Sequence, residues 1–359
     1  MHLKLITTIL LCALFLAGAA AAETITLNAQ TQPQYQNGLN YTGTGELLLV
    51  LEGDTVITNT HGSGIESAAP LTIQGTGTLT VTGTENGITA PSITIKSGTI
   101  NARAGVDNGS VSCGLNANTG NITILGGTVY ALAESTSHKN KGLYAEQNVI
   151  IQDGLVTASA NGTVNCFAID GFSADKNGGV FISGGTVIAS ATNGLSRNIG
   201  IDSKYGNVTI SKNPVLAIHI DTCGGQNFAL NRDILKVDSG DVVVFESNDD
   251  GNYRLMHSAN LTRDFTLISG KIFEVSGGKC LTVAKGVKLT TDGAELIHSD
   301  KSVVIQTPAP VIGLLAGLGA AFVLFRRMRK YYRRFIKNRD MENQIIRGRI
   351  KTPAFKRDE

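Results

Sequence analysis

Residues 121–133 read NITILGGTVYALA, a pattern from which the fold class can be inferred. Isoleucine, threonine, valine and alanine alternate in steps of two on either side of a Gly-Gly pair, which predicts two short β-strands joined by a turn. The same unit recurs at five other places, which begin at Leu71, Ser92, Asn148, Gly179 and, in a degraded form, Asn207. Such self-similarity predicts a stacked repeat architecture.

The period of the repeat gives the number of strands in each turn. Equivalent isoleucines lie 22 to 31 residues apart, at Ile73, Ile95, Ile124, Ile151, Ile182 and Ile210. A second short motif lies between the copies and reads GIESA, GITAP, GLNAN, GLYAE, AIDGF and GIDSK in turn. Each turn therefore contains about three strands, and stacking is what buries their apolar faces.

Equivalent strands of stacked turns run in the same direction, and such connections are almost always right-handed. We therefore expect an all-β fold, a single-stranded right-handed parallel β-helix (solenoid). Paired alanines such as Ala131 and Ala133 recur in four of the six units, and small inward-facing residues there allow a narrow coil to close. An antiparallel sandwich is the alternative, but it does not require like motifs at like spacing.

The two ends of the chain predict export and anchoring. Lys4, an apolar run from Leu5 to Ala17 and a small-residue stretch form a predicted signal peptide over residues 1–22. Residues 307–325 are predicted to form a transmembrane helix. Residues 326–359 form a basic tail whose position follows the positive-inside rule.

The charges divide in the same way. The basic tail holds 13 Lys and Arg against 4 Asp and Glu, whereas residues 23–307 hold 17 against 25. We expect the tail to contact membrane lipid and not nucleic acid, because cations next to a span are typical of a stop-transfer signal. The predicted location is the cell membrane, single-pass, with the N-terminal domain extracellular and the C-terminus cytoplasmic.

Between the ends we expect an N-terminal β cap over residues 23–60 and the β-helix repeats over residues 61–231. Residues 232–306 are expected to form further β turns or a C-terminal cap, since an open end would present an unpaired edge. Four cysteines follow the signal peptide without metal-ligand spacing, and buried free thiols are expected: Cys113, Cys166, Cys223 and Cys280. Six N-x-S/T sequons are compatible with a surface glycoprotein.

The G-I-x-A and ITI-x-GGT-x-x-A motifs along residues 62–220 resemble those of secreted carbohydrate-binding-domain β-helix proteins of anaerobic bacteria and archaea. More loosely, they resemble the pectate-lyase-like superfamily. The C-terminal layout is similar to the sorting signals of archaeal and bacterial surface proteins, although this chain continues past the point where those signals stop. The resemblance implies binding of an acidic polysaccharide or cell-surface glycan, with calcium.

The candidate ligand-binding residues are Tyr130, Tyr144, Asp170 and Asp202. The residue that follows the inward apolar position of the short motif is expected to face outward and to form a column, which comprises Glu66, Thr89, Asn116, Tyr144, Asp170 and Asp202. Asp170 and Asp202 lie on neighbouring rungs about 4.8 Å apart. Because two such carboxylates repel unless a cation relieves them, they are the candidate calcium ligands. The alternative is a solvated acidic column without metal.

Tyr144 and Tyr130 could each present a ring for stacking on a sugar, although exposed tyrosine is also ordinary in strands. A non-catalytic binding protein, adhesin or envelope component is the preferred function. A polysaccharide lyase or glycoside hydrolase is the alternative, for which Asp170 with Asp202 is the obvious carboxylate pair. The basic candidates for such an enzyme are Arg103, Arg197 and Lys204.

Overall fold

The structure is a computed structural model. It describes residues 21–31, 35, 37–105, 111–136, 139–173, 178–222, 225–230, 235–237, 241–298 and 302–305. These residues form strands and turns without an α-helix, which confirms the predicted all-β parallel solenoid. None of the described segments is a helix with the length and apolarity that membrane crossing requires. The predicted transmembrane helix, the basic tail and all but the end of the predicted signal peptide lie outside the described residues.

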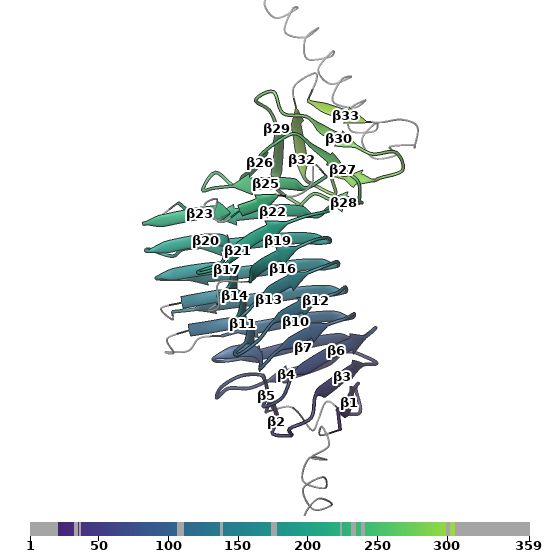
Figure 1. The fold of residues 1–359 in the computed structure, drawn as a ribbon, viewed down its shortest axis with the longest axis vertical. Coiled ribbons are helices and arrows are strands. Elements are labelled where there is room, and N and C mark those ends of the chain that lie inside the picture. Colours follow the sequence, from purple (N-terminus) through teal and green to yellow (C-terminus); the bar gives the residue numbers. More distant parts are fainter. Residues whose placement is uncertain are drawn as a thin grey trace, which may run out of the picture. The chain divides into compact units, whose positions relative to one another are not determined.

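Three long sheets share the coil, and successive strands of the chain enter them in rotation (Figure 1). The first sheet contains β1 (Glu23–Leu27), β3 (Leu47–Leu51), β6 (Leu71–Gly75), β9 (Ile93–Ile95), β12 (Ile122–Ile124), β15 (Val149–Ile151), β18 (Gly179–Ile182), β21 (Asn207–Ile210) and β24 (Leu235–Val237). The second sheet contains β4 (Thr55–Thr58), β7 (Thr78–Gly83), β10 (Thr99–Ala104), β13 (Thr128–Ser135), β16 (Leu155–Gly162), β19 (Thr186–Thr192), β22 (Val215–Ile220), β25 (Val243–Ser247), β26 (Asn252–Leu255), β29 (Ile272–Val275) and β32 (Glu295–His298).

The third sheet contains β2 (Leu39–Tyr41), β5 (Ile65–Ser67), β8 (Asn86–Ala90), β11 (Val111–Ala117), β14 (Lys139–Ala145), β17 (Asn165–Gly171), β20 (Arg197–Asp202) and β23 (Gln226–Leu230). Two small sheets follow. The fourth contains β27 (Ala259–Leu261), β30 (Leu281–Val283) and β33 (Val303–Ile305), and the fifth β28 (Phe265–Thr266) and β31 (Leu289–Thr290).

Residues 23–60, expected as a cap, contribute β1 to β4 to the three long sheets. As far as β25, the described strands of the three long sheets pair in parallel with equivalent strands of neighbouring turns, whereas β25 and β26 pair antiparallel. From β26 the chain makes further parallel turns around a second core that is rich in aromatic rings, including Phe245, Phe265 and Phe273.

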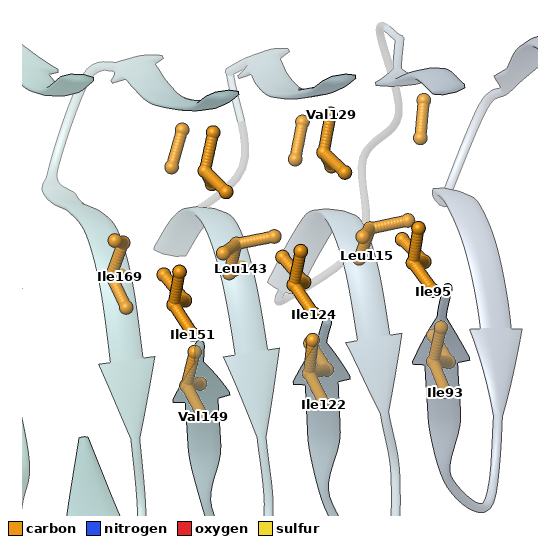
Figure 2. Packing of buried hydrophobic residues seen from close by; sticks show 14 of the residues in the cluster. Ile93, Ile95, Leu115, Ile122, Ile124, Val129, Leu143, Val149, Ile151 and Ile169 are labelled. Atoms are coloured by element: carbon orange, nitrogen blue, oxygen red, sulfur yellow. The ribbon is translucent and has the colours of Figure 1, made fainter. Parts of the chain in front are cut away.

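The core consists of columns of like residues that repeat from turn to turn (Figure 2). In the first sheet Ile95, Ile124 and Ile151 lie in register and are fully buried. In the third sheet Leu115, Leu143 and Ile169 form the facing column (Figure 2). The recurring alanines of the second sheet are buried and in register, which confirms their predicted inward positions: Ala102, Ala131, Ala158 and Ala189.

Glycine makes the bend between the first and second sheets possible. Gly98, Gly127, Gly154 and Gly185 hold φ values between 78° and 97°, a left-handed conformation that glycine adopts without strain. This explains why five of the six copies of the repeat carry a Gly-containing turn, whereas in the degraded sixth copy Lys212 adopts a positive φ of 59°. At the entry to the first sheet, Asn148 donates its side-chain amide to Asn121 Oδ1 (2.9 Å) and accepts from the Gly179 amide (2.8 Å), so that neighbouring turns are joined by side chains as well as by backbone.

Candidate functional site

The predicted column exists as a line of register partners on the third sheet. Thr89 pairs with Asn116, Asn116 with Tyr144, Tyr144 with Asp170, and Asp170 with Asp202. The alignment expected from the short motif is therefore confirmed. It brings Tyr144, Asp170 and Asp202 together on β14, β17 and β20.

The exposure of this column differs from the expectation. Asp170 is 5% exposed and Asp202 is 8% exposed, so neither carboxylate belongs to a solvated acidic face. The partner of Asp170 is Lys141, whose Nζ lies 2.8 Å from Asp170 Oδ2. Burial of a carboxylate is tolerated where a cation compensates for the lost hydration.

Lys141 also contacts the aromatic residues of the site. Its Nζ lies 3.3 Å from the centroid of the Tyr144 ring and 5.9 Å from that of Phe167, which are favourable positions for a cation near a ring. The Tyr144 hydroxyl donates a hydrogen bond to Glu146 Oε2. Burial, and then this bond to a carboxylate, raises the pKa of Tyr144. The ammonium group therefore covers one face of the ring that was predicted to stack on a sugar.

Sequence reasoning missed Lys141 because strict alternation places residues three apart on opposite faces. Gly142 interrupts the alternation. A Cβ at Gly142 would lie 2.7 Å from Ser159 N in the facing sheet, and Leu143 is also buried in the core. Because Gly142 and Leu143 both face inward, the residues on either side of them, Lys141 and Tyr144, lie on the same side of β14. A glycine directly before the inward leucine of the short motif was the signal available in the sequence.

The calcium prediction does not fit this arrangement well. Calcium takes about six to eight oxygen ligands, whereas one of the two candidate carboxylates, Asp170, is already paired with Lys141. The part of the chain that the structure describes contains no group of three or more His, Cys, Asp or Glu side chains placed to hold a metal ion. A calcium ion at this position would therefore need ligands beyond Asp170 and Asp202.

Tyr130 lies on a different sheet from the other three candidates. It belongs to β13 in the second sheet, where it pairs with Asn101 and Thr157, and it is 41% exposed. The structure therefore separates Tyr130 from Tyr144, Asp170 and Asp202.

An open hollow of about 310 Å³ lies at the ends of strands β13, β16 and β19. It is lined by Glu134, Ser135, Thr136, Asn161, Gly162, Thr163 and Asn193. These residues follow the paired alanines in successive copies of the repeat, so polar groups accumulate at one place when the turns stack. Sequence reasoning considered the alanines and not the polar residue after each pair.

Hydrogen bonds join the side chains of the hollow into a row that crosses successive turns. Arg103 Nη2 donates to Glu134 Oε2 (2.6 Å), and Asn161 Nδ2 donates to Glu134 Oε1 (3.4 Å). Asn193 Nδ2 then donates to Asn161 Oδ1 (2.8 Å), and the backbone N–H of Asn193 donates to Asp221 Oδ2 (2.8 Å). The row holds carboxylate and amide groups in fixed positions at the surface, and together these groups can both donate to and accept from a polyhydroxylated ligand.

Tyr130 and Glu134 lie on the same outward face of β13, because they are four residues apart and β13 alternates between exposed and buried positions. At the usual rise of a strand the two residues are about 13 Å apart. The face thus combines an exposed ring with a polar hollow. By contrast, the basic candidate Lys204 lies over Phe172 and Tyr205, near the end of the third sheet.

Comparison with known proteins gives one match. Residues 19–214 match a family model described as carbohydrate-binding domain-containing protein, which is more than half of the 359 residues. The matched part includes Tyr130 and every residue that lines the hollow. No curated protein and no solved structure matches the chain.

Proposed function

The chain belongs to the carbohydrate-binding domain-containing protein family, and from this membership we propose that it binds a polysaccharide on the outer face of the second sheet. Membership suggests the class of ligand, and the structure suggests where such a ligand would lie. The proposed binding surface consists of Tyr130 and the residues of the hollow around Glu134, Asn161 and Asn193.

The observation that carries the proposal is the combination of an exposed ring with fixed polar groups. An aromatic ring stacks on the apolar face of a sugar at a small entropic cost, because tyrosine has few rotatable bonds. The amides of Asn161 and Asn193 are already held by hydrogen bonds to their neighbours, so that little side-chain freedom is lost on binding. The open hollow suits a chain of sugars better than an enclosed small molecule.

Binding without catalysis is the preferred form of this function. Glycoside hydrolysis takes two carboxyl groups on opposite sides of the scissile bond. Among the described residues that line the hollow, Glu134 alone carries a carboxylate, and that carboxylate is paired with Arg103. These contacts favour a structural role for Glu134.

We further propose that the solenoid is held at the cell surface by the predicted transmembrane helix, with membrane lipid contacted by the basic tail. The acidic character of the polymer, the involvement of calcium and the ligand roles of Tyr144, Asp170 and Asp202 also stay predictions. They are included in the same experiment.

The test is binding of the purified full-length protein to acidic and neutral polysaccharides, with calcium or with chelator, while new reducing or unsaturated ends are measured. We expect binding without product. Tyr130→Ala should weaken binding about fivefold, since a stacking ring contributes about 1 kcal/mol. Tyr205→Ala is the matched control, because Tyr205 is 44% exposed but lies outside the proposed surface.

Three outcomes would change the proposal. Release of new chain ends would place the protein among polysaccharide-active enzymes. Weaker binding in Asp202→Asn, with Tyr130→Ala unchanged, would move the site to the third sheet. Absence of binding to every polymer in both buffers would leave a structural or protein-adhesive role.

A further inference from the structure

Lys141 and Asp170 form an ion pair whose burial is unusual for charged side chains. Their side chains are 8% and 7% exposed, and lysine and aspartate are rarely buried to this extent. The pair joins two different turns, because Lys141 lies on β14 and Asp170 on β17, the next strand of the third sheet. None of the contacts of the proposed polysaccharide surface involves either residue.

The environment of the pair is poor at solvating separate charges. Lys141 Nζ contacts the rings of Tyr144 and Phe167. Asp170 Oδ1 is buried and finds no hydrogen-bond donor among the described residues. A buried carboxylate oxygen without a donor costs stability, and conversion of the pair to an amide would remove both buried charges.

The geometry of the pair also meets the requirement for a reaction between its members. A nucleophile and an electrophile that are held in contact behave as if at very high concentration, which removes much of the barrier to bond formation. Lys141 Nζ lies 2.8 Å from Asp170 Oδ2, and the carboxyl carbon is the atom bonded to that oxygen. The two side chains are more than nine-tenths buried, so water has little access and the product of a condensation would not readily be hydrolysed.

We propose that Lys141 and Asp170 condense to form an intramolecular isopeptide bond between Lys141 Nζ and Asp170 Cγ. The neutral amine attacks the carbonyl carbon of the neutral carboxylic acid, and the N–C bond forms. The C–O bond to the hydroxyl breaks, and this oxygen leaves with its own proton and one proton from the amine as water. One proton stays on the amide nitrogen. The reaction is neither an oxidation nor a reduction, and it consumes no other reactant.

We assign the relay of the proton to Asp202 from its place in the register. It is the register partner of Asp170 on β20 and is 8% exposed, so the two backbones lie about 4.8 Å apart. Cys113, the register partner of Lys141 on the other side, is not expected to compete as a nucleophile. Burial raises the pKa of Cys113 to about 12, although the Lys141 charge opposes this, and the thiol therefore stays protonated.

The test is peptide mapping of the full-length protein by mass spectrometry after complete denaturation. An amide at Lys141 blocks tryptic cleavage there, so we expect residues 140–176 as one peptide, lighter by one water. Without the bond, trypsin releases residues 142–176. Lys139, which is exposed and two residues away, is the internal control and should be cut in either case.

A second digestion separates the bond from a chemical alternative. Asp170 precedes Gly171, and such a pair can lose water by closing a succinimide ring. Cleavage after Glu146 distinguishes the two, because residues 140–146 and 147–176 stay joined only if the isopeptide bond is present. A succinimide leaves residues 147–176 as a separate peptide and leaves Lys141 open to trypsin.

The variants provide matched controls. Lys141→Arg keeps the positive charge beside Asp170 but cannot form this amide, and cleavage at Glu146 should then release residues 147–176 as a separate peptide. Asp202→Asn should leave a large fraction of the protein unlinked. Complete linkage in Asp202→Asn would remove the relay from the proposal. Full tryptic cleavage after Lys141 in the denatured wild-type protein would overturn the proposal itself.

Discussion

The stacking register can be tested at two adjacent isoleucines of β15. Ile151 is fully buried between Ile124 and Ile182 of the neighbouring turns, whereas Ile150 lies on the opposite face and is half-buried. Ile151→Ala removes three buried carbons at about 0.8 kcal/mol each and leaves a cavity. We therefore expect the free energy of unfolding to fall by about 3 kcal/mol. Ile150→Ala should cost about 1 kcal/mol or less, which is the scale of strand propensity.

The measurement is urea denaturation of the purified protein, monitored by circular dichroism. The curves of the wild type and both variants are fitted with one common m value, the slope of the unfolding free energy against urea concentration. The two variants remove the same atoms from adjacent residues, so composition and local chain environment cancel. Equal losses, or a larger loss for Ile150→Ala, would refute the register. A shift of one residue exchanges the buried and exposed faces of a strand, and that exchange is what the reversed order would show.

Three further predictions concern the Asn148 side chain, the Cys113 thiol and the His219 imidazole. Asn148→Ala removes the acceptor of the Gly179 backbone amide, and we expect the free energy of unfolding to fall by about 1 to 3 kcal/mol. An unchanged urea midpoint would contradict a stabilising role for the asparagine side chains that join neighbouring turns. Cys113 is buried and burial raises its pKa to about 12, so a thiol reagent at about pH 8 should label it only after unfolding; rapid labelling of the native protein would be inconsistent with its position. Burial lowers the pKa of His219, although the Asp221 carboxylate opposes this. The folded state then binds fewer protons than the unfolded state, so stability is lost as pH falls through about 6.5. His219→Gln should flatten the dependence of the urea midpoint on pH between about 7 and 5, and an unaltered slope would exclude this histidine as its source.

The coil could be predicted from the sequence because each of its features repeats. The isoleucines of the first sheet, the alanines of the second and the glycines of the bend recur at equivalent positions, and the structure places each set in one column. Repetition supplies many independent observations of the same local preference. A single strand pair would have left the choice between helix and strand, or between parallel and antiparallel pairing, far less certain.

The candidate site was predicted only in part, because its chemistry depends on residues that break the repeat. The alignment of Tyr144, Asp170 and Asp202 follows from the motif spacing. Lys141 does not, since Gly142 interrupts the alternation that decides which side chains share a face. The hollow was missed for another reason. Glu134, Asn161 and Asn193 are ordinary polar residues within their own turns, and they become a surface only when the turns are stacked.

The reversal between β25 and β26 restricts how this protein can change its length during evolution. Before this point, duplication of one unit adds a turn whose two edges match its neighbours, and each turn extends the coil by about 4.8 Å. The antiparallel pair has no such freedom, because a copied segment that spans it would place strands of opposite direction next to a parallel ladder. Growth or loss of whole turns between β4 and β25 would therefore adjust the reach of the molecule while leaving its C-terminal strands unchanged.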